Sequence, residues 1–317
     1  MTADVYTKNR ALLFGIAYRM LGSVAEAEDL VQETFVRWQR QDAATIVTPK
    51  AWLVATLTRL GIDQLRSARN RREEYVGVWL PEPLVDTKAP APDRVAALGD
   101  SLGMAFLFML EILGPVERAV FLLREAFDYD YAEIAAIVGK SEAACRKMVS
   151  RAKNHFAQRE PANTAPSPKA EQVVQRFTSA CATGDLSELL AVLTNDAVLY
   201  TDGGGQVRAV RRPIRSADRI SRFLAAIHRR FPSSTPVVLT RVNGEIGTVT
   251  RRADGYLSVS AFAFSGDRIR AIYTVSNPEK LRHALRPSNA AIERAGRSSD
   301  VVRPAGESAH PFPRAQL

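Results

Sequence analysis

The chain has 317 residues, more than one compact core usually requires, so we expect two or three domains. Its 46% hydrophobic and 24% charged residues are typical of a globular protein and exclude collagen-like and largely disordered chains. The net charge of +9 is uneven, because residues 1–160 hold 21 basic and 21 acidic side chains whereas residues 161–317 hold 22 and 13. The total charge therefore does not by itself indicate a nucleic-acid partner.

The sequence contains no signal for a membrane, a metal or an oxidising compartment. Its longest strongly apolar stretch, Leu102 to Leu110, is about half the length that a bilayer requires. The N-terminus lacks the apolar core of a secretory signal. Two cysteines cannot form a disulfide framework, and four scattered histidines lack metal-ligand spacing. We expect a cytoplasmic protein without a metal or cofactor.

The first predicted domain, residues 1–75, is helical. Ser23 and Glu26 form a capping-box pattern that predicts a helix beginning near Ala25. Thr48 followed by Pro49 predicts the start of a second helix, which runs to about residue 72. Trp52 shares this helix or its end with an arginine cluster, Arg59, Arg66, Arg69, Arg71 and Arg72. These groups suit a single nucleic-acid strand, but a solvated basic helix end is the alternative.

Two proline-rich stretches divide the remaining chain. Residues 76–100 contain four prolines and predict a linker, and residues 161–167 predict a second one. Between them, residues 101–160 have helical patterning. Tyr131 to Val138, followed by Gly139 and Ser141, has the outline of a helix-turn-helix.

The second helix of this motif has an exposed cationic side, which suits the major groove of DNA. An ordinary helical hairpin with a solvated basic face fits the pattern equally well. Between residues 140 and 153 the chain carries five basic side chains, Lys140, Arg146, Lys147, Arg151 and Lys153, against the single acidic Glu142.

Residues 168–286 predict an α+β domain. Helical stretches come first, and β-rich runs then alternate with hairpin signals such as Asn243-Gly244 and Asp254-Gly255. Residues 287–317 are rich in Ser, Ala, Arg and Pro and predict a mobile tail.

Residues 6–75 resemble region 2 of sigma-70-type transcription initiation factors of the extracytoplasmic-function (ECF) group. The resemblance is carried by Tyr18-Arg19-Met20-Leu21-Gly22, Ala27 to Phe35, Ala51-Trp52-Leu53 and Asp63 to Ser67. Residues 101–158 resemble region 4 through Leu122 to Glu125, Tyr131 to Ala135 and Ser150-Arg151-Ala152. The two modules in this order are more specific than either motif alone.

The resemblance implies a sigma factor rather than an enzyme, with core RNA polymerase and promoter DNA as partners. It implies that the polymerase contacts are made with the β′ clamp helices and the β flap. It assigns the clamp-helix face to Asp29, Gln32, Glu33 and Arg37. It assigns the melted minus-ten element to Arg59, Asp63, Arg66 and Arg69, and the minus-thirty-five element to Arg146, Lys147, Ser150 and Arg151.

The remainder is similar to an ECF subgroup with a C-terminal SnoaL-like domain of the NTF2-like fold. Three segments carry this resemblance: Trp79-Leu80-Pro81-Glu82-Pro83-Leu84, Asp202-Gly203-Gly204-Gly205 and Asn277-Pro278-Glu279-Lys280-Leu281. Gln206 and Glu279 differ from the Lys and Asp usual in the subgroup. The resemblance implies that this domain modulates the factor from within, with the Trp79–Leu84 segment as a docking element.

Two other functions fit parts of the sequence. SnoaL relatives include isomerases and cyclases, and Asp202, His228, Tyr200, Tyr256 and Tyr273 are candidates to line a small-molecule cavity. Asp202 before three glycines is more simply a turn residue that bonds its own backbone. A repressor would use the helix-turn-helix alone, but it would not need a module for a melted strand.

Overall fold

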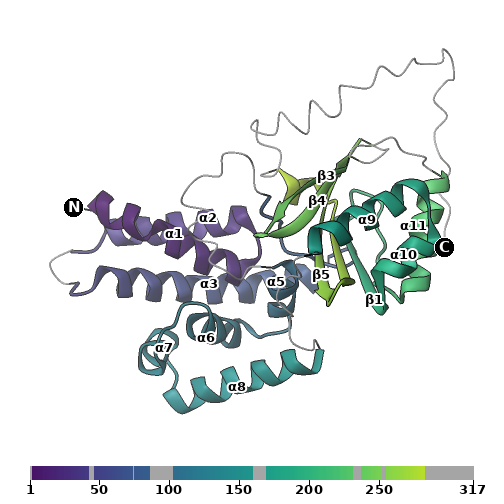
Figure 1. Cartoon of the computed structure of the whole chain (residues 1–317). Helices are drawn as coiled ribbons and strands as arrows, with labels where there is room; N and C mark the ends of the chain where they lie inside the picture. Colours follow the sequence, from purple (N-terminus) through teal and green to yellow (C-terminus); the bar gives the residue numbers. More distant parts are fainter. Residues whose placement is uncertain are drawn as a thin grey trace.

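The N-terminal part of the molecule is a layer of long helices. The computed structural model describes residues 2–42, 46–73, 75–85, 103–159, 169–230, 237–251 and 255–282. Helices α1 (Thr2–Leu21), α2 (Val24–Gln39) and α3 (Pro49–Glu73) lie side by side (Figure 1). The Ser23 side chain accepts a hydrogen bond from the Glu26 N–H at the start of α2, and Pro49 begins α3.

The next helices are α5 (Met104–Leu110), α6 (Pro115–Glu125), α7 (Tyr131–Val138) and α8 (Glu142–Arg159). Asp130 and Glu133 form a reciprocal capping box at the start of α7, and Gly139 ends it in the left-handed conformation with φ 66°. The Ser141 hydroxyl accepts from the Ala144 N–H at 3.2 Å as α8 begins. The predicted helix-turn-helix is therefore confirmed as α7 and α8.

The two helical parts share one hydrophobic core. Leu57 of α3 and Val120 of α6 are fully buried in the same cluster of side chains. Arg118 of α6 is 3% exposed, and its Nη1 donates to the Met20 carbonyl oxygen at 2.7 Å and to Glu111 Oε1 at 2.8 Å. Helix α6 consequently packs against α1 and α3, and α7 packs against α3.

The C-terminal part combines helices with one mixed sheet. Its helices are α9 (Ala170–Thr183), α10 (Leu186–Val192), α11 (Ala217–Arg230) and α12 (Pro278–Leu281). Its strands are β1 (Leu193–Asp202), β2 (Ile214–Arg215), β3 (Val237–Val242), β4 (Glu245–Arg251), β5 (Leu257–Ser265) and β6 (Arg268–Val275). The strand order is β2-β1-β6-β5-β4-β3, with β1 and β6 parallel and the other pairs antiparallel. Asn243 and Gly244 both have positive φ in the β3–β4 turn, as the hairpin signal predicts.

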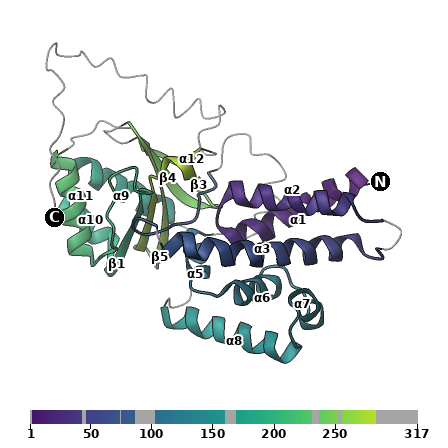
Figure 2. The same ribbon diagram turned by 180° about the vertical axis from the view of Figure 1, so that it is seen from behind.

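Each face of this sheet is covered by a different part of the chain. Residues alternate along a strand, so Leu199 packs on the side of α9, α10 and α11, whereas Tyr200 packs on the opposite side. That opposite side is covered by Leu80 and by Met104 and Phe108 of α5, which lies beside β5 in both views (Figures 1 and 2). The sheet is thus sandwiched between its own helices and segments from the N-terminal half.

The fold class read from the sequence is confirmed: two all-helical parts precede an α+β part. One grouping differs in space, because α5 belongs in sequence to the second helical domain and packs on the C-terminal sheet. Residues 86–102, 160–168 and 283–317 lie outside the described residues, and with them part of the first predicted linker, all of the second and the predicted tail. Within the described part, no helix has the length and apolarity needed to span a bilayer.

Candidate nucleic-acid interface and the linker network

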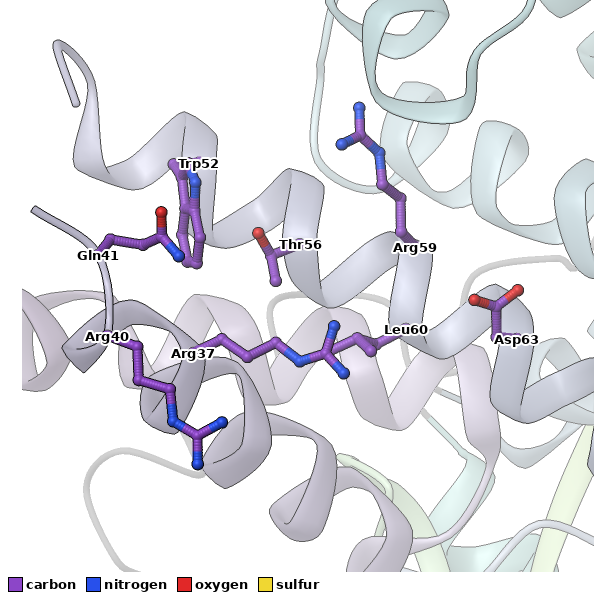
Figure 3. A pocket seen from close by; sticks show the side chains of 8 residues that line it. All are labelled: Arg37, Arg40, Gln41, Trp52, Thr56, Arg59, Leu60 and Asp63. Carbon is purple, nitrogen blue, oxygen red and sulfur yellow. The ribbon is translucent and has the colours of Figure 1, made fainter. Parts of the chain in front are cut away.

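A pocket of about 430 Å³ opens between α2 and α3 (Figure 3). Trp52 forms one wall and lies with its ring centroid 5.5 Å from that of the buried Trp38. The other lining residues are Arg37, Arg40, Gln41, Thr56, Arg59, Leu60 and Asp63. Three guanidinium groups against one carboxylate, beside an aromatic face, are a combination that suits a nucleotide with its phosphate.

Arg59 is the pocket residue that also touches the helix-turn-helix. Its Nε donates to the Ile137 carbonyl oxygen at 2.8 Å and its Nη2 to the Ala136 carbonyl oxygen at 3.0 Å. These carbonyls belong to the last turn of α7, where helix carbonyls lack intrahelical partners and attract cations. The side chain that the resemblance places on DNA is therefore engaged by α7 in this structure.

The other predicted minus-ten residues lie further along α3. Asp63 Oδ1 pairs with Arg66 Nη1 at 3.0 Å, and both side chains are mostly exposed. Arg69 lies in α3, but its side chain is outside the described residues. An exposed pair of this kind contributes about 0–1 kcal/mol, so Arg66 can leave it for a phosphate at little cost.

The predicted polymerase-binding residues share one exposed face of α2. Asp29, Gln32, Glu33 and Arg37 are all exposed, whereas Leu30, Val31 and Trp38 on the opposite face are buried. Glu33 Oε1 accepts from Arg37 Nε at 2.7 Å, an i,i+4 pair within this face. Arg37 is also a pocket residue, so it lies where the two predicted surfaces meet.

The predicted recognition helix α8 presents Arg146, Lys147, Ser150 and Arg151 to solvent. Arg146 pairs with Glu142 at 2.5 Å and lies over the Tyr131 ring at 4.9 Å. Arg151 Nε donates to Glu117 Oε1 at 3.2 Å. Cys145, Val149 and Ala152 on the other side are buried, which confirms the amphipathic division read from the sequence.

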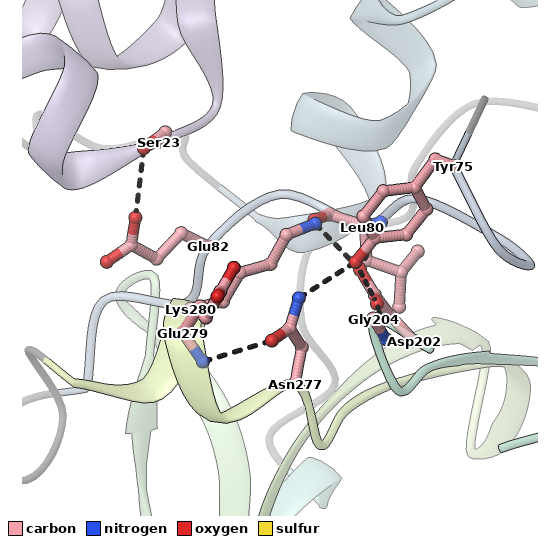
Figure 4. A network of polar contacts seen from close by, with 9 residues as sticks. All are labelled: Ser23, Tyr75, Leu80, Glu82, Asp202, Gly204, Asn277, Glu279 and Lys280. Carbon is pink, nitrogen blue, oxygen red and sulfur yellow. Dashed lines mark hydrogen bonds and ion pairs between the residues drawn. The ribbon is translucent and has the colours of Figure 1, made fainter. Parts of the chain in front are cut away.

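A buried polar network attaches the linker to the C-terminal domain (Figure 4). Asp202, at the end of β1, is 1% exposed. Its Oδ1 accepts from the Tyr75 hydroxyl at 2.6 Å, and its Oδ2 accepts from the Leu80 N–H at 2.9 Å and from Lys280 Nζ at 2.7 Å. The Gly204 N–H donates to Oδ1 at 3.0 Å. One carboxylate therefore joins the linker, the glycine turn and α12.

The other two signature segments complete this network. Asn277 caps α12 by accepting from the Glu279 N–H and donates from Nδ2 to the Tyr75 hydroxyl at 2.9 Å. Lys280 Nζ also donates to the Leu80 carbonyl oxygen at 2.5 Å and lies 4.1 Å from the centre of the Trp79 ring. Burial, together with the hydrogen bond to Asp202, raises the pKa of Tyr75. The phenol therefore stays a donor.

The three glycines permit this close packing. A Cβ at Gly203 would lie 2.2 Å from the Val207 carbonyl oxygen, and one at Gly204 would lie 2.3 Å from Asn277 Nδ2. Gly204 and Gly205 both have positive φ, 61° and 73°. Gly205 faces Val76. The turn is thus built to bring its backbone against the linker and α12.

Glu82 links the same segment to the N-terminal helices. Its Oε2 accepts from the Val24 N–H at 2.8 Å and from the Ser23 hydroxyl at 3.2 Å, so a linker residue caps α2. Burial is the main cause that raises the pKa of this carboxyl group. The Tyr18 hydroxyl donates to the Glu82 carbonyl oxygen at 2.6 Å and accepts from Asn243 Nδ2 at 2.7 Å. Tyr18, Glu82 and Asn243 thereby join α1, the linker and the β3–β4 turn.

The remaining linker residues continue this contact. The Leu84 N–H donates to Asn243 Oδ1 at 3.2 Å, and its carbonyl oxygen accepts from the Asn243 N–H at 2.7 Å. Pro81, Pro83, Leu80 and Leu84 are buried. Sequence reasoning identified this segment but missed Tyr18, Tyr75 and Asn243. The sequence indicates Asn243 only as a turn residue and Tyr18 only as part of the region 2 resemblance, and it gives no signal for Tyr75.

The small-molecule site considered from the sequence does not assemble. Tyr200 and Tyr273 stack at 5.2 Å, and Phe108 of α5 packs on both rings. His228 lies near Gly184 on the helical side of the sheet, and Tyr256 is 44% exposed. Tyr200, Tyr273 and Asp202 share one face of the sheet, but Leu80 and α5 fill that face, and His228 lies across the sheet from them.

Comparison with known proteins agrees with this arrangement. Residues 5–71 match the family model of sigma-70 region 2, and residues 103–156 match that of sigma-70 region 4. The chain is 37% identical over 292 residues to the ECF RNA polymerase sigma factor SigJ of Mycobacterium tuberculosis, covering 88% of this chain and 93% of that protein. It is 32% identical over 282 residues to the probable ECF sigma factor SigI of the same species, covering 87% and 94%.

A crystal structure of M. tuberculosis SigJ superposes with a TM-score of 0.73 at 31% identity, covering 89% of this chain and 98% of that one. The two helical parts with their exposed cationic surfaces define a two-module transcription initiation factor. The chain belongs to the ECF family of RNA polymerase sigma factors, and it directs transcription.

Proposed function

We propose that this sigma factor binds core RNA polymerase and promoter DNA in the cytoplasm, and that its C-terminal domain controls when the DNA surfaces are available. The exposed polar face of α2 would contact the β′ clamp helices, and helices α6 to α8 would contact the β flap. The pocket with Trp52 and Arg59 would hold the melted minus-ten strand, and the exposed face of α8 would lie on the minus-thirty-five duplex.

The observation that carries the regulatory part is the engagement of Arg59 by α7. The two modules pack through a common core, and the pocket cation donates to carbonyls of the helix-turn-helix. The linker and α5, which connect the modules, are both docked on the C-terminal sheet. The C-terminal domain thus favours a closed arrangement, and polymerase and DNA would favour an open one.

The first test is transcription by the full chain with core RNA polymerase. We expect transcripts from a defined start site that depend on the added chain, and absence of association with the core enzyme would refute the proposal. The regulatory part is tested by Tyr18→Phe, which removes one hydroxyl between α1, the linker and Asn243. We expect more transcript than wild type, whereas Tyr6→Phe on the same helix should match wild type. Equal yields from the two variants would contradict the regulatory role.

A ligand of the C-terminal domain receives no support from the arrangement of the sheet. The face on which a small molecule would lie is packed with Leu80, Met104 and Phe108 from this chain. A ligand would need to displace these segments, which would itself open the closed arrangement. We therefore propose a regulatory rather than an enzymatic role for this domain.

A further inference from the structure

The strongest charged patch outside these surfaces lies at the free edge of the C-terminal sheet. The loop after the glycine turn, strand β2 and helix α11 together span residues 203–230. This stretch holds eight arginines, no lysine and one acidic residue, Asp218. It supplies most of the positive excess of the second half of the chain.

Four of these arginines lie on the loop before β2, on β2 and in the first turn of α11. Arg211, Arg212, Arg215 and Arg219 are exposed, and within the described residues they form no hydrogen bond or ion pair through their guanidinium groups. Arg222, one turn further along α11, pairs with Asp218 at 2.9 Å. Strand β2 is the edge strand beside β1, so Arg215 lies at the border of the sheet. We name Arg211, Arg212, Arg215 and Arg219 the edge patch.

The edge patch begins where the linker leaves region 2. A Cβ at Gly77 would lie 3.6 Å from the Arg211 Cα, and one at Gly205 would lie 3.4 Å from the Val76 Cβ. Helix α3 ends at Glu73, so its last residue is at most about 14 Å of extended chain from Gly77. The C-terminal end of α3 carries the arginine cluster in its sequence. A short stretch of linker therefore connects the end of α3 to the edge patch.

The choice of arginine indicates the chemistry of the partner. A surface that only needs solubility can use lysine or glutamate as well, whereas arginine presents a planar fork that binds phosphate with two hydrogen bonds. Duplex DNA carries one charge for about every 1.7 Å of its axis, and four residues of extended chain reach at most about 14 Å, so arginines spaced from 211 to 215 can meet several phosphates. We propose that the edge patch binds the phosphate backbone of duplex DNA, independently of base sequence, beside the DNA held by region 2.

This proposal rests on the proposed function only for the identity of the DNA. Arg59 is held by α7 in the closed arrangement, but the edge patch is exposed in it. The patch should therefore bind duplex DNA in the free full-length chain, before core polymerase is added. Two modest contacts on one chain then reinforce each other when region 2 is also engaged.

The test compares two triple variants of equal net charge. The edge-patch variant combines Arg211→Gln, Arg212→Gln and Arg215→Gln. The control is Arg241→Gln, Arg251→Gln and Arg268→Gln, which are exposed and lie on β3, β4 and β6 away from the β2 edge. The affinity of each full-length chain for two unrelated 30-base-pair duplexes is measured by fluorescence anisotropy from about 50 to 200 mM salt. Unchanged thermal unfolding of both variants confirms that they fold.

We expect the edge-patch variant to bind both duplexes at least tenfold more weakly than the control. Its slope of log affinity against log salt should be smaller by about 2 to 3, since each phosphate contact contributes about 0.9. The matching triple Arg→Lys variant should keep most of the slope but lose affinity, because charge remains and the fork is lost.

Three results would overturn the proposal. Equal losses in the two Gln variants would show only the effect of net charge. Unchanged binding in both would remove the patch from the DNA surface. Loss of binding to core RNA polymerase with unchanged duplex binding would assign the patch to an acidic protein surface. Because duplex binding is measured without polymerase, failure of the sigma-factor assay does not decide this experiment.

Discussion

Asp202→Asn tests whether one buried carboxylate holds the linker on the C-terminal domain. The amide keeps the size of the side chain but removes the charge that faces Lys280 Nζ at 2.7 Å. One of its two ends also becomes a donor, so Tyr75 and the Leu80 N–H compete for a single acceptor oxygen. The variant therefore removes the negative partner of a buried ion pair and leaves the Lys280 ammonium without it.

Breaking a buried ion pair by removing one partner costs about 3–5 kcal/mol. Lys280 retains 12% exposure, so water can stabilise its ammonium in part and the lower figure of about 3 kcal/mol applies. A loss of 3 kcal/mol corresponds to a factor of about 150 in an equilibrium constant. Because the network joins the linker to the domain, we expect this loss to favour undocking of the linker.

The assay is amide hydrogen exchange of the Leu80 N–H, which donates to Asp202 in the wild type. We expect this amide to exchange on the order of 100-fold faster in the variant. The control is Asp196→Asn on the same strand, because that side chain is 70% exposed and lies 3.8 Å from Arg270. An exposed pair contributes about 0–1 kcal/mol. If Leu80 exchanges at the same rate in both variants, the assigned role of Asp202 is wrong.

Three further predictions concern other contacts of the closed arrangement. Arg59→Ala removes two exposed or partly exposed hydrogen bonds, which together contribute about 1 kcal/mol to holding α7 on α3. We expect the backbone amides that follow Ile137 to exchange faster in this variant, as measured by hydrogen exchange. Phe108→Ala empties a half-buried site between two tyrosines and should lower the free energy of unfolding by about 2–3 kcal/mol, measured with urea. Glu82 has a folded pKa above its ordinary 4.5, so its ionisation in the folded state costs stability. The free energy of unfolding of wild type, relative to that of Glu82→Gln, should therefore fall as pH rises from 4.5 through that raised pKa. Urea titrations across this pH range measure it, and a difference that grows with pH would contradict the prediction.

The fold class was predictable because its signals are local. Pro49 and Ser141 mark helix starts, Gly139 marks a helix end, and Asn243-Gly244 marks a hairpin, each through the conformations that these residues favour. The buried side of α8 also followed from a spacing of three and four residues. These inferences need no knowledge of which distant segments meet.

The linker network was only half predictable because its contacts are not local. The sequence predicts that Asp202 is a turn residue that bonds its own backbone, and it does accept from the Gly204 N–H. Its other partners include Tyr75 and Lys280, which are 127 and 78 residues away in sequence. Likewise, α7 captures Arg59 across 78 residues. No periodicity or spacing encodes such pairs, since packing of the whole chain creates them.

The closed arrangement combines interactions that respond differently to a partner. The shared core of α3 and α6 is apolar, so polymerase must offset its burial by covering comparable apolar surface. The contacts of Arg59 and Asp202 are polar and specific. A phosphate can replace the α7 carbonyl oxygens at Arg59, and displacement of the linker breaks the hydrogen bonds of Asp202 separately. Moving a two-state equilibrium from 1:99 to 99:1 takes about 5.5 kcal/mol. Leaving Lys280 without its buried partner costs about half of that, so a change confined to the linker network is large enough to alter how readily polymerase opens the chain.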